Sequence, residues 1–169
     1  MDKKFNLTDE LKKELKRRNI LEQEDDNDQD DNDQDVKEES NGSKQNTDFN
    51  EMISKLLHSQ TQVHVFHLGA KGNGSYAAHK ALQGYYEGID GLVDGVIESY
   101  QGKYGLITNY DTYKMEKFDS VKRCISYFNT LNDMITDKRK SVEDSFIQNQ
   151  IDTVQELLFS TVYKLKFLS

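Results

Sequence analysis

Four residues of the chain have side chains that commonly bind metal ions and could meet at one site: His67, His79, Asp94 and Glu98. Imidazole and carboxylate groups together suit iron, manganese or zinc. On one helix, His79 and Asp94 lie roughly 22 Å apart, so a single chain cannot hold one ion between them. Two antiparallel copies of the helix, related by a two-fold axis near residues 88–89, place His79 opposite Glu98 of the partner subunit. We therefore predict a site with both histidines from one subunit and both carboxylates from the other.

The helix that must position these groups, residues 75–101, has a distinct core face on a helical wheel. Four glycines form a stripe beside its polar face, and each costs roughly 1 kcal/mol relative to alanine. Close approach of another backbone, from the bundle or from a second subunit, would compensate for this cost. The core face contains Leu82, Tyr85, Tyr86, Ile89, Leu92, Val93, Val96 and Ile97; the polar face contains His79, Gln83, Glu87, Asp90, Asp94 and Glu98; the stripe contains Gly84, Gly88, Gly91 and Gly95.

Helical periodicity continues on both sides of this segment. A first helix is predicted from an N-cap at Thr47 to Gly69, and two more over about 116–136 and 142–167. Four helices without a strand pattern of comparable strength predict an all-α four-helix bundle, with a long middle connection that suits a crossover. The expected inward residues of these three helices are Phe49, Ile53, Leu56, Leu57, Val63 and Phe66; Phe118, Val121, Ile125, Phe128, Leu131 and Ile135; and Phe146, Ile151, Val154, Leu158, Val162 and Leu165.

The N-terminal part of the chain differs in composition. Residues 1–48 hold nine Lys and Arg against sixteen Asp and Glu, whereas the remainder is nearly balanced. Residues 22–47 include "DDNDQDDNDQD" and have the composition of a disordered linker; calcium or mineral binding is the alternative. Residues 1–21 predict a short amphipathic helix, which either docks on a partner protein or packs on its own domain. Residues 48–169 form the predicted bundle.

The charge and hydropathy of the chain argue against DNA-binding, membrane-spanning and secreted proteins. Neither half of the chain has the basic excess that non-specific DNA binding requires. No apolar run is long enough to span a bilayer, and the N-terminus lacks the apolar stretch of a signal peptide. A single cysteine, Cys124, suits a reducing compartment. We therefore expect a cytoplasmic protein that does not contact membranes.

Residues 67–105 resemble the Dps family, the mini-ferritins of the ferritin-like superfamily. In that family a histidine precedes a glycine-containing turn, and a second histidine follows twelve residues after the first. An Asp-x-x-x-Glu pair lies further along the helix that contains the second histidine. A carboxylate also follows the second histidine by four residues. The two histidines, the turn glycine and the Asp-x-x-x-Glu pair match at His67, Gly72, His79, Asp94 and Glu98.

The resemblance extends over about residues 48–169 and implies a ferritin-like subunit with a short extra helix in its middle connection. It also implies a hollow dodecamer with iron (Fe2+/Fe3+) bound at the dimer two-folds. Family members oxidise Fe(II), preferably with hydrogen peroxide, and store ferric mineral; some bind DNA through basic tails. The motif also resembles that of small ferritin-like proteins of tailed bacteriophages, which would place the chain in the host cytoplasm or the virion.

The chain departs from the family pattern at three places. Gln83 stands where the carboxylate after the second histidine is expected, and Glu87, one turn later, is a candidate replacement. The tail is acidic rather than basic, which argues against DNA binding. Leu68 follows the first histidine, where the family often has Trp. Two functions therefore remain open: an iron-oxidising storage protein, or a structural or interaction protein with a degenerate metal site and a docking N-terminal helix.

Other motifs favour structural roles. The glycine-rich segment 69–74 has no preceding strand and lacks the Walker spacing, so a helix–helix turn is the better interpretation. His58 and His64 fall within the first helix pattern and are expected to be structural or exposed. Cys124 lies beside core positions of the third helix and is expected to be a buried, inert thiol.

Overall fold

The structure, a computed structural model, describes residues 36–169, with side chains from residue 47 onward. This part of the chain contains no strand, and its helices are α2 (Val36–Gly69), α3 (Ser75–Tyr104), α4 (Val121–Lys138) and α5 (Ser145–Phe167). A short 3-10 helix, η1 (Arg139–Ser141), joins α4 to α5. The all-α four-helix bundle is thereby confirmed. The predicted helix of residues 1–21 and the acidic repeat lie outside the described residues.

Most helix boundaries lie within three residues of the predicted ones, and two differ by more. Helix α2 begins at Val36 rather than near Thr47, so the last part of the expected linker is helical. Helix α4 begins at Val121 rather than 116, because Ser120 has extended backbone geometry and its side chain accepts a hydrogen bond from the Arg123 N–H. That contact is a standard N-cap, and it fixes the first turn.

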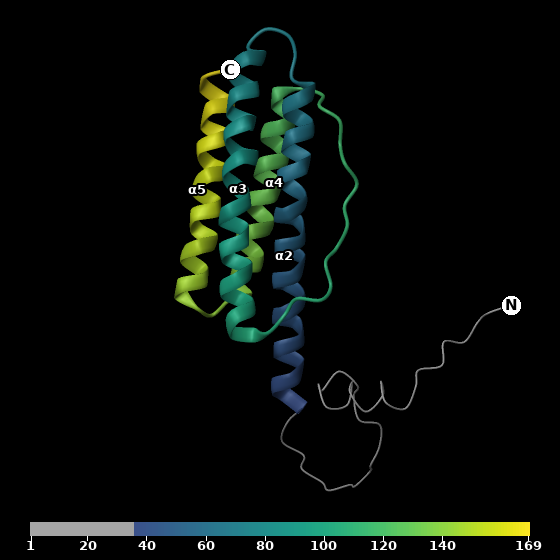
Figure 1. The fold of residues 1–169 in the computed structure, drawn as a ribbon, viewed down its shortest axis with the longest axis vertical. Coiled ribbons are helices and arrows are strands. Elements are labelled where there is room, and N and C mark those ends of the chain that lie inside the picture. Colours follow the sequence, from purple (N-terminus) through teal and green to yellow (C-terminus); the bar gives the residue numbers. More distant parts are fainter. Residues whose placement is uncertain (1–35) are drawn as a thin grey trace, which may run out of the picture. The chain divides into compact units, whose positions relative to one another are not determined.

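The helices run up, down, down and up in chain order, with α2 and α3 forming one hairpin and α4 and α5 another (Figure 1). The connection between the hairpins, residues 105–120, runs back along the length of the bundle, so that α4 starts at the end where α2 finishes. This is the long middle crossover, the single-crossover arrangement known from ferritin-like folds.

The crossover contains no helix, so the short extra helix implied by the resemblance is absent from residues 105–120. Its backbone is instead bonded by side chains of α2. The Gln62 amide donates to the Glu116 carbonyl at 2.8 Å and accepts from the Glu116 N–H at 2.7 Å. Ser54 accepts from the Asp111 N–H at 2.9 Å. These contacts provide partners for three backbone groups of the crossover and fasten it to α2 without a helix.

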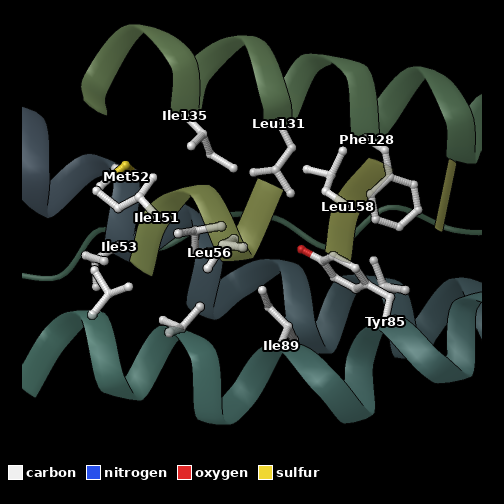
Figure 2. Packing of buried hydrophobic residues seen from close by; sticks show 14 of the residues in the cluster. Met52, Ile53, Leu56, Tyr85, Ile89, Phe128, Leu131, Ile135, Ile151 and Leu158 are labelled. Atoms are coloured by element: carbon white, nitrogen blue, oxygen red, sulfur yellow. The ribbon is translucent and has the colours of Figure 1, made fainter. Parts of the chain in front are cut away.

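Side chains from all four helices meet in one core (Figure 2). Phe49 stacks on Tyr100 with ring centroids 3.6 Å apart, and the buried Tyr85 hydroxyl is 2.8 Å from the Ser59 hydroxyl. Burial raises the pKa of Tyr85, which keeps this hydroxyl protonated. Most of the expected inward positions are buried or packed against this core.

Two expected inward residues are exposed instead. Leu57 is 39% and Phe146 is 49% exposed. Leu57 directly follows Leu56, and Phe146 directly precedes Ile147; both Leu56 and Ile147 are fully buried. In both cases the apolar run offered two adjacent candidates, and packing against the facing helices selected the other one. Across the described residues, no helix is long and apolar enough to cross a bilayer.

Candidate metal centre

The candidate site begins at the hairpin between α2 and α3. Helix α2 stops at Gly69, where an added Cβ would lie 2.5 Å from the Cβ of Phe118 at the end of the crossover. The turn then passes through Gly72 and Gly74, whose φ angles of 94° and 75° are left-handed and favour glycine. This compact turn brings the last turn of α2 against the first turns of α3.

The hairpin places the side chains of His67 and His79 face to face. Their ring centroids lie 3.5 Å apart with an angle of 28° between the ring planes. The Nδ1 of His67 is 3.0 Å from the carbonyl oxygen of His79, and the Nδ1 of His79 is 3.2 Å from the carbonyl oxygen of His67. His67 is buried at 7% exposure, whereas His79 is half-buried. The two histidines predicted as ligands are therefore in direct contact.

This reciprocal pairing fixes the ring tautomers. A carbonyl oxygen can only accept, so each Nδ1 carries a proton, and in a neutral imidazole of this tautomer the lone pair is on Nε2. Neither Nε2 has a hydrogen-bond partner among the described residues. Histidines that bind metals commonly donate their second ring nitrogen to a carbonyl in the same way. The pair thus presents two oriented nitrogen donors.

Two further rings surround the pair, and the sequence analysis did not assign them to the site. His64 stacks on Tyr86 with centroids 4.3 Å apart, and its ring centroid is 5.7 Å from that of His67. Tyr86 also meets His67 edge to face, with centroids 5.1 Å apart. The sequence spacing could have indicated both residues. His64 is one helical turn before His67, and Tyr86 is two turns after His79, so each lies on the same helix face as its histidine.

Asp94 and Glu98, the predicted carboxylate ligands, lie elsewhere on α3. Both are exposed, and neither makes a hydrogen bond or ion pair with the described residues. They lie one turn apart on the same helix, and roughly 22 Å of helix separates Asp94 from His79. No group of three or more histidine, cysteine or acidic side chains suited to a metal ion occurs within residues that the structure describes. Within one subunit the two histidines and the two carboxylates are therefore separate groups.

Gln83 and Glu87, the weaker candidates, form a chain of hydrogen bonds beside the histidine pair. The Lys80 ammonium donates to the side-chain Oε1 of Gln83 at 2.6 Å, and the side-chain Nε2 of Gln83 donates to the Glu87 carboxylate at 2.7 Å. Glu87 is thus one helical turn away from the expected carboxylate position and hydrogen-bonded to the residue that occupies it. A rotation of Glu87 toward the histidines would have to break that bond.

The glycine stripe of α3 has open space around it. A Cβ added at Gly84, Gly91 or Gly95 would meet nothing within 4 Å, and one added at Gly88 would meet the Leu157 side chain at 3.3 Å. Close backbone approach within the bundle, one of the two expected reasons for the stripe, is therefore wrong. The other, approach of a second subunit, stays a prediction.

The residues set aside earlier pack as structural groups. Cys124 is a buried free thiol whose pKa burial raises to about 11, so it stays protonated at neutral pH. His58 lies half-buried with its ring edge-on to Tyr113. The glycine-rich segment 69–74 is the turn between α2 and α3.

Comparison with known proteins gives one match. A family model described as a family of unknown function, DUF5856, covers residues 67–165. The chain belongs to this family. No curated protein and no solved structure matches it significantly. The DUF5856 region begins at the first histidine of the stacked pair. It includes every candidate ligand, the whole crossover, α4, and α5 up to residue 165.

Proposed function

We propose that this DUF5856 protein binds Fe(II) between two subunits, oxidises it and stores the ferric product, as the resemblance to Dps proteins implies. The observation that carries the proposal is the reciprocal pairing of His67 and His79. Stacked imidazoles that each donate Nδ1–H to a carbonyl are held rigidly, with their remaining lone pairs available to a cation.

The second half-site supports the same proposal. Asp94 and Glu98 are exposed and unpaired within the described chain, so a partner's metal could recruit them without breaking an existing interaction. An antiparallel α3 pair about residues 88–89 aligns them with the partner's histidines. The open space at Gly84, Gly91 and Gly95 leaves room for the close helix–helix approach that this pairing needs.

The proposed chemistry gives separate roles to the histidine pair and to the two carboxylates. The two Nε2 atoms bind and orient the Fe(II) substrate, and the carboxylates balance the positive charge that increases as Fe(II) becomes Fe(III). Hydrogen peroxide accepts two electrons, one from each of two Fe(II) ions, and leaves as hydroxide or water. The carboxylates also provide hard oxygen ligands that favour Fe(III).

Anaerobic Fe(II) titration of the full chain, followed by peroxide, tests the proposal. We expect saturable Fe(II) binding and rapid oxidation, with both lost in Asp94→Ala. A matched control is Asp133→Ala, which removes an exposed carboxylate of α4 that is not a candidate ligand. Absence of stoichiometric binding, or an Asp94→Ala oxidation rate equal to that of the unmodified chain, would overturn the proposal.

The second candidate is a structural or interaction protein with a degenerate metal site. The observation that favours it is Gln83, a neutral side chain at the expected carboxylate position that is hydrogen-bonded to both Lys80 and Glu87. In that case residues 1–21, which lie outside the described residues, would bind a partner protein. A protein that binds no iron but loses a partner when residues 1–21 are deleted would establish this second function.

A further inference from the structure

The solvent-facing side of α3, which would meet a second subunit, is acidic. Its carboxylates belong to four exposed residues, Glu87, Asp90, Asp94 and Glu98. None of the four forms an ion pair with any residue that the structure describes. A protein surface that approaches this side of α3 therefore meets uncompensated negative charge.

The lysines of α3 do not neutralise these carboxylates. The Lys80 ammonium donates to the neutral side chain of Gln83 at 2.6 Å. Lys103, in the last turn of the helix, is paired with Asp144 just before α5. The negative charge of the α3 face is thus left to solvent or to a partner.

The antiparallel pairing about residues 88–89 brings like charges together. In that register Glu87 lies opposite Asp90 of the partner subunit, and the two-fold axis repeats the contact, so four carboxylates gather at the centre. The axis is perpendicular to both helices and therefore keeps the two polar faces on the same side of the contact. Gly84 and Gly91 have open space around them, so the backbones and their charges can approach closely. Such like-charge contacts oppose association.

The ends of the same contact lack positive charge as long as no metal is bound. There the stacked pair of His67 and His79 faces Asp94 and Glu98 of the other chain, and neutral imidazoles do not balance carboxylates. An Fe(II) ion placed between them adds two positive charges and bonds both chains at once. The metal therefore reverses the sign of the interaction at each end of the contact.

We propose that Fe(II) controls the pairing of two subunits through α3: the acidic faces keep metal-free chains apart, and Fe(II) joins them. This inference rests on the proposed function, because the ion occupies the same shared site. A ligand that binds the pair better than the separate chains tightens the pair by the same factor. The iron site is thus assembled by its own substrate and comes apart when the substrate is absent.

Sedimentation equilibrium of the full chain tests the proposal without any oxidation step. The protein is measured in metal-free buffer and then with anaerobic Fe(II) and no peroxide. We expect Fe(II) to lower the dissociation constant of the dimer at least about tenfold. Raising the salt from about 20 mM to about 500 mM should tighten the metal-free dimer, because salt screens repulsion between exposed charges. A metal-free chain that is already fully dimeric at about 1 µM in low salt would overturn the proposal.

A charge reversal identifies the face that forms the contact. Asp90 is exposed and is not a candidate ligand, and Asp90→Lys converts both central repulsions into attractions to Glu87 of the partner subunit. Asp90→Lys should therefore tighten the metal-free dimer at least about tenfold. The matched control, Asp133→Lys, makes the same charge change at an exposed position of α4 and should leave the dimer unchanged. Equal association of the two variants would overturn the proposal.

The Fe(II) titration separates this inference from the proposed function. Saturable Fe(II) binding with an unchanged dissociation constant of the dimer would overturn this inference alone. Loss of Fe(II) binding altogether would overturn the proposed function and this inference with it. Fe(II) binding accompanied by dimer formation, together with a metal-independent dimer of Asp90→Lys, is the expected result.

Discussion

The imidazoles of His67 and His79 cap each other's backbone: each ring donates Nδ1–H to the carbonyl of the other residue. The carbonyl of His67 lies in the last turn of α2, where helix carbonyls lack intrahelical donors. His79 supplies one such donor across the turn, and the Ala70 N–H supplies another at 3.3 Å. The pair therefore closes the hairpin as well as orienting two nitrogen lone pairs.

The proposed sharing of the site between subunits predicts complementation. Inactive His79→Ala and Asp94→Ala proteins, unfolded together and refolded, should recover about a quarter of the unmodified oxidation rate. Half of the random dimers are mixed, and each mixed dimer restores one of its two sites. Stopped-flow absorbance of Fe(II) oxidation by peroxide measures the recovery.

The control for complementation pairs His67→Ala with His79→Ala. Both residues come from the same subunit in the proposed site, so mixing these proteins should restore nothing. Recovery in this pair, or none in the His79→Ala and Asp94→Ala pair, would contradict the proposed division of the ligands.

Gln83→Glu should increase iron binding. The substitution places a carboxylate four residues after His79, and Lys80, which already bonds position 83, can balance part of its charge. Repulsion between the new carboxylate and Glu87, now bonded at 2.7 Å, should free Glu87 to rotate. Anaerobic titration should give a higher Fe(II) stoichiometry for Gln83→Glu than for the unmodified chain. A Gln83→Ala protein with the same gain would show that the added charge is irrelevant.

The lowered pKa of His58 predicts that the stability of the fold depends on pH. Burial lowers the pKa of His58 below its ordinary 6.5, and Lys55 lowers it further against the opposing Glu116 and Lys114 backbone. Below about pH 6.5 the unfolded chain therefore binds more protons at this site than the folded chain, so the free energy of unfolding falls as pH falls. Urea unfolding at pH 7 and pH 5 should show a smaller loss for His58→Phe than for the unmodified chain. Equal losses would contradict this assignment.

Phe49 should be among the costly core positions. Its side chain is fully buried and stacks on Tyr100. Phe49→Ala should lower the free energy of unfolding by about 3–5 kcal/mol, as large aromatic truncations in cores do. Leu57→Ala, on the same helix but 39% exposed, should cost about 1 kcal/mol or less. Urea denaturation followed by far-UV circular dichroism measures both, and equal costs would contradict the burial pattern.

The sequence was most informative about which residues of a helix are buried. The core face of α3 was predicted from periodicity, because apolar residues recur at helical spacing over its length. The irregular crossover was not predicted in detail, because Gln62 and Ser54, distant in sequence, bond its backbone. Local periodicity contains no information about such partners. The start of α4 was readable in principle from Ser120, a good N-cap residue.

The candidate site was predicted as a set of residues but not as a geometry. Spacing brought His67 and His79 to neighbouring ends of a hairpin, yet the ring stacking depends on backbone angles in the turn. The same turn explains why His64 was assigned a structural role: its contact with Tyr86 exists only once α2 and α3 are paired. Whether Asp94 and Glu98 complete the site depends on a second subunit, which one sequence does not specify.

The crossover also has a consequence for the order of folding. Helices α2 and α3 meet through a short turn, as do α4 and α5, so each hairpin can form from contacts that are local in sequence. Joining the hairpins requires closure of the longer segment 105–120, whose entropic cost comes before any contact between them. We therefore expect the hairpin of α2 and α3, which carries both histidines, to gain hydrogen-exchange protection before the crossover does. Pulse-labelling during refolding would detect that order, and early protection at Asp111 or Glu116 would contradict it.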